Sequence, residues 1–264
     1  MQKSSIVFLI SGFASLLVAF VMEGGSPAGL LAPTAAIIVF GGTIGAVGLS
    51  FPFEELKEFP KALKTIFFFQ KRNLVEEILY FKEVSGKTRA EGLLAFDKEL
   101  EKITEPFLKK GLRMVVDGFD AAAVRTIMEK DMELMTIRHK VPAEICESAG
   151  GFSPTMGVVG TVMGLINVLG NLSEPDKLGG AIALAFIATL YGVAFANLVY
   201  LPIGSKLKAF HKQEMYEKDF YMEGVLLIQE GANTFMLIEK LKGFLTHEQK
   251  HEFERMQNKN PEGA

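Results

Sequence analysis

Four stretches of this sequence contain no charged side chain, and each is long enough to cross a membrane as a helix. A helix rises about 1.5 Å per residue, so about 20 apolar residues cross a hydrocarbon core of about 30 Å. Only 22% of the 264 residues are charged, and all of them lie outside these blocks. This partition excludes an ordinary soluble enzyme, a disordered tail protein and a basic nucleic-acid-binding protein. The charge-free blocks are residues 4–22, 24–53, 148–173 and 178–205.

Two alternatives to four membrane spans come from the blocks themselves. The first block resembles the apolar part of a signal peptide, but no A-x-A-like cleavage site precedes Glu23. The third and fourth blocks contain several hydroxyl and amide side chains, which a buried hairpin of a soluble protein also carries. Because both blocks are long and uncharged, we expect an all-α integral membrane protein with four transmembrane helices.

The basic residues predict the orientation of the chain. Most of the 28 Lys and Arg residues lie either between the second and third blocks or after the fourth. Because basic residues next to spans favour the cytoplasmic side, we expect both termini and the middle segment in the cytoplasm. The predicted divisions are helices one and two in 1–53, a cytoplasmic helical domain in 54–147, helices three and four in 148–205, and cytoplasmic C-terminal helices and tail in 206–264.

The segment after the second block has an apolar stripe at helical spacing. Leu56, Phe59, Leu63 and Phe67 alternate with lysines, which is typical of an amphipathic helix. We interpret it as lying on the inner membrane surface, where it would contact lipid. A helix packed against the protein core is the alternative.

Helices are expected in the rest of the cytoplasmic part, because no strand-like alternation stands out. Gly111 and the Asp117–Gly118 pair read as stop and turn signals, and Pro142 is expected to interrupt a long helix that starts at Asp120. The last 18 residues are polar and are expected to fray. Other predicted helices cover residues 88–103, 206–229 and 237–244.

Two short motifs resemble enzyme signatures only weakly. His247 to His251 matches the zinc-protease pattern H-E-x-x-H, but it lies in a charged tail with little room for a third ligand. Ser85 to Thr88 resembles the end of a phosphate-binding loop, but Phe81 occupies the position of the required glycine. We therefore expect no metal site, no cofactor and no enzymatic activity.

No Asp, Glu, Lys, Arg or His lies inside the four blocks, so a transported cation has no charged ligand there. If this protein moves cations, a partner helix must supply the carboxylate. Thr161 and Thr189 lie near mid-span and offer hydroxyl oxygens, although each is also able to bond back to its own helix.

Glycines and prolines in the blocks predict close packing and bending. The pairs Gly41/Gly45 and Gly160/Gly164 have the spacing that lets helix backbones approach closely. Pro154 and Pro202 lie near the cytoplasmic ends of the third and fourth spans, where they form either simple boundary kinks or hinges.

Four sequence stretches together resemble the flagellar stator subunits of the MotA/PomA/MotP family, over nearly the whole chain. The resemblance implies a ring of five copies around a dimer of a MotB-like partner, whose membrane helix supplies an aspartate. Cations pass between that aspartate and the third and fourth spans, and the ring turns and pushes the rotor protein FliG. Such a complex resides in the bacterial cytoplasmic (inner) membrane and binds no nucleic acid. The stretches are residues 89–97, 111–118, 154–166 and 189–197.

The resemblance also assigns roles to individual residues. It implies an ion path at Thr161 and Thr189, coupling hinges at Pro154 and Pro202, and rotor contacts at Arg89 and Asp97, the last replacing a frequent Glu. Thr161 and the stretch 189–197 resemble sodium-type members, so Na⁺ is favoured as the transported ion, with H⁺ as the alternative. An ExbB/TolQ-like proton-driven energiser is the alternative family, but its members usually have three spans and an outside N-terminus.

Overall fold

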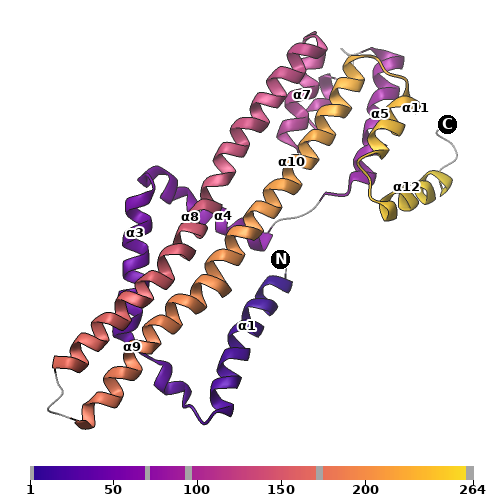
Figure 1. The fold of residues 1–264 in the computed structure, drawn as a ribbon. Coiled ribbons are helices and arrows are strands. Elements are labelled where there is room, and N and C mark those ends of the chain that lie inside the picture. Colours follow the sequence, from indigo (N-terminus) through magenta and orange to yellow (C-terminus); the bar gives the residue numbers. More distant parts are fainter. Residues whose placement is uncertain (1–2, 69–71, 93–96, 171–174, 260–264) are drawn as a thin grey trace. The chain divides into compact units, whose positions relative to one another are not determined.

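The computed structural model describes residues 3–68, 72–92, 97–170 and 175–259, which form helices and no strand (Figure 1). The all-α prediction is therefore confirmed for these residues. The chain divides into two compact units. The first unit contains residues 1–69 and 139–210, and the second contains residues 70–138 and 211–264. Two long helices, α8 (Ala121–Gly170) and α10 (Leu201–Gln229), contribute residues to both units.

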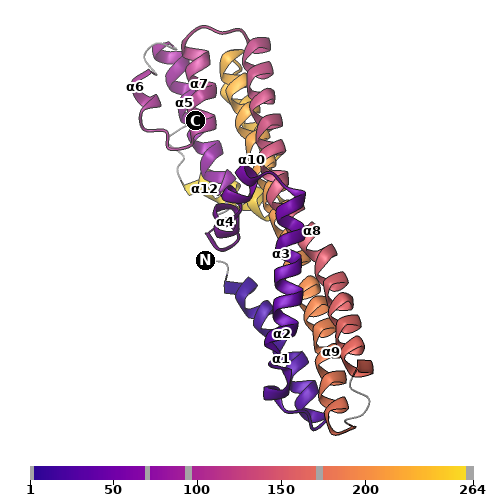
Figure 2. The same ribbon diagram turned by 90° about the vertical axis from the view of Figure 1, so that its left-hand side faces the viewer.

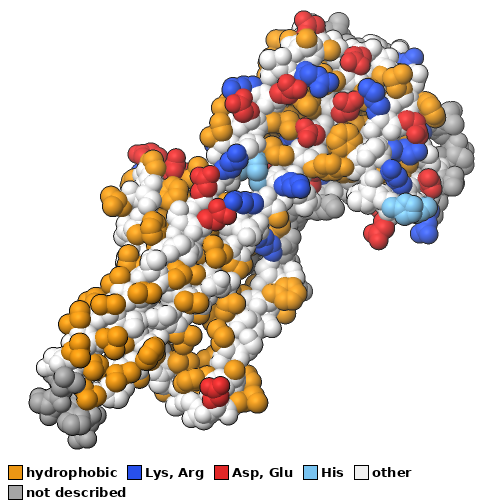
Figure 3. Space-filling model, in the orientation of Figure 1, with side chains coloured by type: hydrophobic (Ala, Val, Ile, Leu, Met, Phe, Trp, Pro, Cys, Tyr) orange, Lys and Arg blue, Asp and Glu red, His pale blue; other side chains and the backbone are white. Residues whose placement is uncertain are grey.

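Four helical stretches of the described residues are long and apolar enough to cross a membrane, as predicted. They are Ser4–Met22, Pro27–Ser50, and parts of Ala121–Gly170 and Leu178–Gln229. In the first unit, hydrophobic side chains cover the visible face of α8 and α9 (Pro175–Phe195) and few charges interrupt them (Figure 3). Such a surface is suited to lipid or to other apolar helices.

The first two spans differ in regularity. The first is the single helix α1 (Lys3–Met22). The second span runs beside α8 and α9 and consists of four short pieces (Figure 2). These pieces are the 3₁₀ turn η1 (Pro27–Leu30), α2 (Pro33–Ala36), the π-helical η2 (Ile37–Gly41) and α3 (Gly42–Ser50).

The third and fourth spans belong to long helices that continue beyond the charge-free blocks. The expected interruption of the third at Pro142 is wrong, because α8 is helical through both Pro142 and Pro154. The fourth span is α9, followed by the π-helical η4 (Ala196–Tyr200) and then by α10. The predicted helix over 206–229 is confirmed as part of α10.

In helix α4 (Phe53–Phe68), three residues of the apolar stripe, Leu56, Phe59 and Leu63, are half-buried and pack against protein. Leu56 and Phe59 pack into a cluster with Ile145, and Leu63 packs into a cluster with Cys146. These partners all belong to the first unit, and the lysines of α4 remain exposed. These contacts favour the packed-helix alternative, and the position of α4 at the inner membrane surface stays a prediction.

The helices of the second unit pack around a hydrophobic core that contains several aromatic rings. Its helices are α5 (Leu74–Glu91), α6 (Asp97–Leu100), α7 (Pro106–Val116), the adjoining parts of α8 and α10, α11 (Thr234–Lys242) and α12 (His247–Lys259). Phe81 and Phe220 are fully buried, and their ring centroids lie 5.8 Å apart. Gly224 allows this packing, because a Cβ at that position would lie 2.4 Å from the Phe81 ring.

Three expectations for the second unit are wrong, and one is confirmed. The helix expected over 88–103 ends instead at Glu91, because Gly92 adopts a φ of +85°. Gly111 is buried inside α7 rather than ending a helix. The tail expected to fray forms α12 as far as Lys259, anchored by Phe253, which is 1% exposed. The turn at Gly118 is confirmed, with a φ of +82°.

Candidate functional site: the contact between α8 and α9

Helices α8 and α9 approach each other closely through small residues, as the Gly160/Gly164 spacing predicts. A Cβ at Gly160 would lie 2.6 Å from the Ala188 Cβ, and one at Gly164 would lie 2.6 Å from the Ala185 Cβ. The other predicted pair behaves differently, because a Cβ at Gly41 or Gly45 would meet nothing within 4 Å. Within this chain, close packing is therefore confirmed only for the pair on α8.

Two further glycines bring the backbones of α8 and α9 into direct contact. A Cβ at Gly157 would lie 2.9 Å from the Ala188 carbonyl oxygen, and one at Gly192 would lie 2.5 Å from the Ser153 carbonyl oxygen. The buried Ser153 hydroxyl donates a hydrogen bond to the Gly192 carbonyl oxygen, 3.1 Å away. Carbonyl groups of each helix are thus accessible to side chains of the other.

Thr161 and Thr189 meet at this contact. Their hydroxyl groups hydrogen-bond to each other. The Thr161 Oγ1 also lies 2.9 Å from the Ala185 carbonyl oxygen on α9 and 3.2 Å from the Gly157 carbonyl oxygen on its own helix. The Thr189 Oγ1 lies 3.4 Å from the same Gly157 oxygen. Thr161 therefore makes the bond to its own helix that we considered, and it also bonds across the helix pair.

This arrangement gathers four neutral oxygen atoms, from two hydroxyl groups and two carbonyl groups. A hydroxyl group donates only one hydrogen bond, so the close oxygens compete for two protons and each hydroxyl has lone pairs left to offer. Neutral oxygens of this kind replace the water around an alkali cation in membrane channels. The site is therefore chemically suited to a partly dehydrated cation. The positive charge of that cation must be balanced by a negative group that neither helix supplies here.

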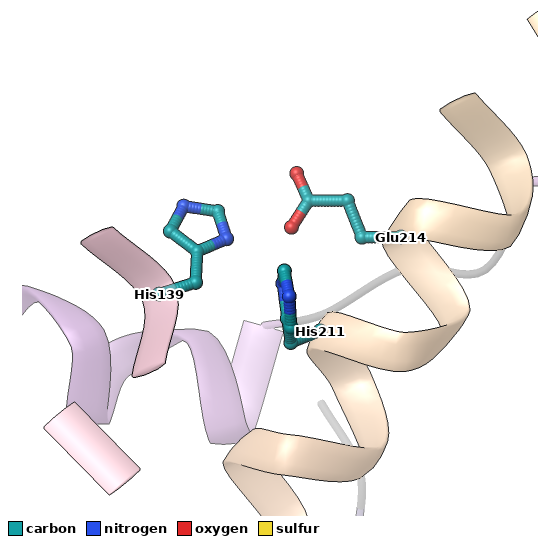
Figure 4. Close-up of side chains that lie close together, drawn as sticks. All are labelled: His139, His211 and Glu214. Atoms are coloured by element: carbon teal, nitrogen blue, oxygen red, sulfur yellow. The ribbon is translucent and has the colours of Figure 1, made fainter. Parts of the chain in front are cut away.

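Three titratable side chains, drawn in Figure 4, belong to α8 and α10 and stand outside the charge-free blocks. Figure 4 shows His211 and Glu214, which leave α10 one turn apart, and His139, which is carried by α8. None of the three stands in the stretches 148–173 or 178–205 that contain Thr161 and Thr189. These two stretches therefore offer hydroxyl and carbonyl groups to the candidate ion path, and no carboxylate.

The two predicted hinge prolines occupy different environments. Pro154 is half-buried beside α9, since a Cβ at Gly192 would lie 3.1 Å from its Cα atom. Pro202 is exposed in the first turn of α10, directly after the π-helical η4. π-helical turns are frequent at functional sites, and they change the direction of a helix locally. The role of Pro154 and Pro202 as hinges stays a prediction.

The predicted rotor-contacting residues are both exposed in the second unit. Arg89 lies in the last turn of α5, and Asp97 is the first residue of α6. Residues 93–96 between them lie outside the described residues, so the part of the 89–97 stretch that includes them is not described. Exposure leaves both side chains accessible to another protein.

Both enzyme-like motifs lie on helices in the described structure. Ser85 to Thr88 lies inside α5, where the Thr88 hydroxyl donates to the Val84 carbonyl oxygen at 3.0 Å, so the backbone forms no phosphate-binding loop. The Nε2 atoms of His247 and His251 lie 3.2 Å apart on exposed turns of α12. No third His, Cys, Asp or Glu among the described residues completes a metal-binding group with this pair.

Sequence reasoning assigned no role of their own to two polar residues of the α8–α9 region. Ser153 is fully buried, and Tyr191 reaches the backbone before α2. Their polarity inside an uncharged block is a signal, because polar side chains at membrane depth need partners. Only the fold shows which partners they have.

Two family models cover most of the chain. Residues 99–219 match the MotA/TolQ/ExbB proton channel family, and residues 6–92 match the motility protein A N-terminal model. Among curated proteins, motility protein A of Bacillus subtilis (strain 168) is 39% identical over 246 residues, covering 93% of this chain and 91% of the relative. Chemotaxis protein PomA of Vibrio alginolyticus is 34% identical over 245 residues, covering 93% and 96%.

Solved structures show the same likeness. A chain of the flagellar MotAB stator complex from Bacillus subtilis matches with a TM-score of 0.89 and 37% identity, covering 95% of this chain and 99% of that chain. A chain of C. jejuni MotAB matches with a TM-score of 0.88 and 33% identity, covering 94% and 97%. The likeness therefore extends over the full fold.

Proposed function

The chain belongs to the motility protein A family of the MotA/TolQ/ExbB proton channel group, and from this premise we propose how it works as a stator subunit of a bacterial flagellar motor. With a MotB-like partner it forms a cation-conducting complex that converts ion flow into torque. The ExbB/TolQ-like alternative is not favoured, because the full-length relatives are motility and chemotaxis proteins.

The oxygen cluster around Thr161 and Thr189 carries this proposal. It joins the third and fourth spans by hydroxyl and carbonyl groups, in blocks of sequence without a charged residue. A cation crossing there needs a nearby negative charge, and a partner aspartate at membrane depth supplies it. The two solved structures described above are MotAB complexes, which supports a partner of the MotB kind.

We assign the transported ion as Na⁺, with H⁺ as the alternative. A hydroxyl oxygen is a suitable ligand for Na⁺, and a proton needs no such ligand. Thr161 and Thr189 together offer two such oxygens, next to two carbonyl groups. We expect no cofactor besides the transported ion.

Torque reaches the rotor through the second unit. We place Arg89 and Asp97 at the contact with the rotor protein FliG, because both are exposed charged residues on helices of that unit. Pro154 and Pro202 link the spans to the remainder of α8 and α10. In the proposed assembly five copies form a ring in the cytoplasmic membrane, in contact with lipid and with both termini in the cytoplasm.

Complementation tests this function. The chain is expressed with its natural partner in a flagellated bacterium that lacks its own stator proteins. We expect swimming to return only when both proteins are present. Normal expression of both proteins in the membrane without rotation of tethered cells would contradict the proposal.

A further inference from the structure

The second span begins with backbone that is not helical. Leu31 and Ala32 lie between η1 and α2, with φ and ψ of −82° and 98° for Leu31 and of −125° and 89° for Ala32. Some backbone groups of such a segment lack regular helix partners. In a membrane, irregular backbone persists only where the protein or a water-filled cavity satisfies its polar groups.

Part of this segment is satisfied locally. The Leu31 amide donates to the Ala28 carbonyl oxygen at 3.1 Å, and the Ala32 carbonyl oxygen accepts from the Ala36 amide at 3.0 Å. The Leu30 carbonyl and the Ala32 amide are bound instead by a residue that is far away in the sequence.

Tyr191 of α9 binds both of these groups with one hydroxyl. The hydroxyl donates to the Leu30 carbonyl oxygen and accepts a hydrogen bond from the Ala32 amide, at 3.3 Å. A phenol hydroxyl is able to make both bonds at once, because it has one proton and two lone pairs. The start of the second span is thereby tied to the fourth span.

The ring of Tyr191 is held in place by packing. It stacks on Phe40 of η2, with ring centroids 6.1 Å apart and an interplanar angle of 21°. Around it lies a small buried cluster formed by the start of the second span and α9, which contains Ala32, Ala35, Val39, Ile187 and Ala188. The hydroxyl is therefore not free to choose other partners by a simple rotation of the side chain.

The same turn of α9 carries the candidate ion site. Thr189 precedes Tyr191 by two positions, and Ala188 is 1% exposed between the second span and α8. A Cβ at Gly160 of α8 would lie 2.6 Å from the Ala188 Cβ. Because α9 is packed tightly on both sides, a rotation that changes the Tyr191 contacts also moves Thr189 relative to Thr161.

We propose that Tyr191 is a positioning residue for the ion path: its hydroxyl fixes the start of the second span against α9 and thereby sets how Thr189 faces Thr161. This inference rests on the proposed function, in that the path at Thr161 and Thr189 is taken as the route of the cation. It adds a residue outside that path, on the opposite side of α9, which controls its geometry.

The substitution Tyr191→Phe removes the hydroxyl and keeps the ring that packs on Phe40. Tyr216→Phe is the matched control, because the Tyr216 hydroxyl also donates to one carbonyl oxygen, that of Phe244 at 2.7 Å, in the second unit. Single-motor speed is measured against the concentration of the driving ion, and the number of assembled complexes is counted with a fluorescent tag on the partner.

We expect Tyr191→Phe to raise the ion concentration for half-maximal speed by roughly threefold to tenfold, because the variant loses both hydrogen bonds of the hydroxyl and part of that loss reaches the ion site. Tyr216→Phe should leave this concentration unchanged. A purely structural role of Tyr191 would lower the number of assembled complexes without changing the half-maximal concentration, and that result would overturn the inference. Failure of the unsubstituted protein to drive rotation would instead contradict the proposed function.

Hydrogen exchange gives a second test that does not depend on rotation. The complex is placed in lipid nanodiscs, and exchange of the Ala32 amide is followed by mass spectrometry. We expect this amide to be protected in the unsubstituted complex and to exchange at least several times faster in Tyr191→Phe, since a lost hydrogen bond exposes it. Rapid exchange at Ala32 in the unsubstituted complex would overturn the inference even if the variant fails to assemble.

Discussion

Thr161 on α8 and Thr189 on α9 hydrogen-bond to each other through their hydroxyl groups. The bond joins the third and fourth spans at a point where glycines let the two backbones touch. A neutral pair of hydroxyl groups, next to the carbonyl oxygens of Gly157 and Ala185, is an acceptor site for a cation and not a source of charge. This chain therefore offers neutral oxygen ligands to the cation, and we expect the partner to supply the negative charge.

Removal of either hydroxyl should impair ion-driven rotation without preventing membrane insertion. We expect Thr161→Val and Thr189→Val to lower motor speed about tenfold or more at low ion concentration, because a ligand oxygen is replaced by a methyl group. Thr161→Ser keeps the oxygen and should retain most of the speed.

The control for these variants is Thr155→Val on the same helix. The Thr155 hydroxyl is exposed and bonds to the Phe152 carbonyl oxygen of its own helix, at 2.7 Å. Equal losses of speed in Thr155→Val and Thr161→Val would show that any hydroxyl loss on α8 is harmful, and would contradict the assigned path.

A side chain at Gly157 should force α8 and α9 apart. The new Cβ in Gly157→Ala would lie 2.9 Å from the Ala188 carbonyl oxygen, and backbone cannot move aside as a flexible side chain does. We expect a destabilisation of about 1–3 kcal/mol, typical of overpacking. Gly151→Ala, where nothing lies within 4 Å, should change little. Thermal unfolding of the purified complex measures both; an unchanged midpoint for Gly157→Ala would contradict the close contact.

The buried ion pair between Lys218 and Glu105 should matter far more than surface pairs. Their side chains are 12% and 5% exposed, and Lys218 Nζ also lies 5.4 Å from the centroid of the Phe107 ring. Glu105→Gln leaves a buried ammonium group without its carboxylate, which costs about 3–5 kcal/mol.

The matched surface pair is Lys61 and Glu58, whose side chains are 73% and 64% exposed. Glu58→Gln should cost about 0–1 kcal/mol, because solvent screens the pair. Chemical denaturation of the two variants compares the costs directly. A loss for Glu105→Gln no greater than that for Glu58→Gln would show that the buried pair does not hold α7 against α10.

Reversal of the charge at Arg89 should disrupt torque and be partly rescued by an opposite reversal on the rotor. An exposed interfacial charge acts mainly through complementarity with its partner, so the sign and not the particular side chain is decisive. Arg125→Glu is the control, because Arg125 is also exposed in the second unit and pairs with Glu129 on its own helix at 3.8 Å. Torque on tethered cells is the measurement; absence of rescue by any rotor charge would argue against a direct contact.

The distribution of charge predicted the membrane part of the fold well. Uncharged segments long enough to cross a bilayer fold in few ways other than as transmembrane helices. The spacing of Gly160 and Gly164 predicted the face of α8 that packs closely on α9. The same reasoning identified Thr161 and Thr189 as candidate ion ligands, because their hydroxyl groups lie near the middle of uncharged spans. It did not show that they bond to each other, because that depends on the rotation of two helices.

Tertiary contacts decided the points where local signals gave the wrong result. Gly111 lies inside α7, and the tertiary contact explains the glycine: atoms of Met128 and Val225 lie 2.8 Å and 3.0 Å from its Cβ position and leave no room for a side chain. The polar tail forms α12 because Phe253 is buried in the core of the second unit. Local propensity carries no information about such partners.

The central claim is that the driving cation passes the paired hydroxyl groups of Thr161 and Thr189. The most direct measurement is single-motor speed against external Na⁺ at a fixed proton-motive force, for the unsubstituted protein and for Thr161→Val, each with the natural partner. The account predicts that speed rises with Na⁺ and saturates, and that Thr161→Val shifts this curve to higher Na⁺. Speed that depends on neither external Na⁺ nor the Thr161 hydroxyl would contradict it.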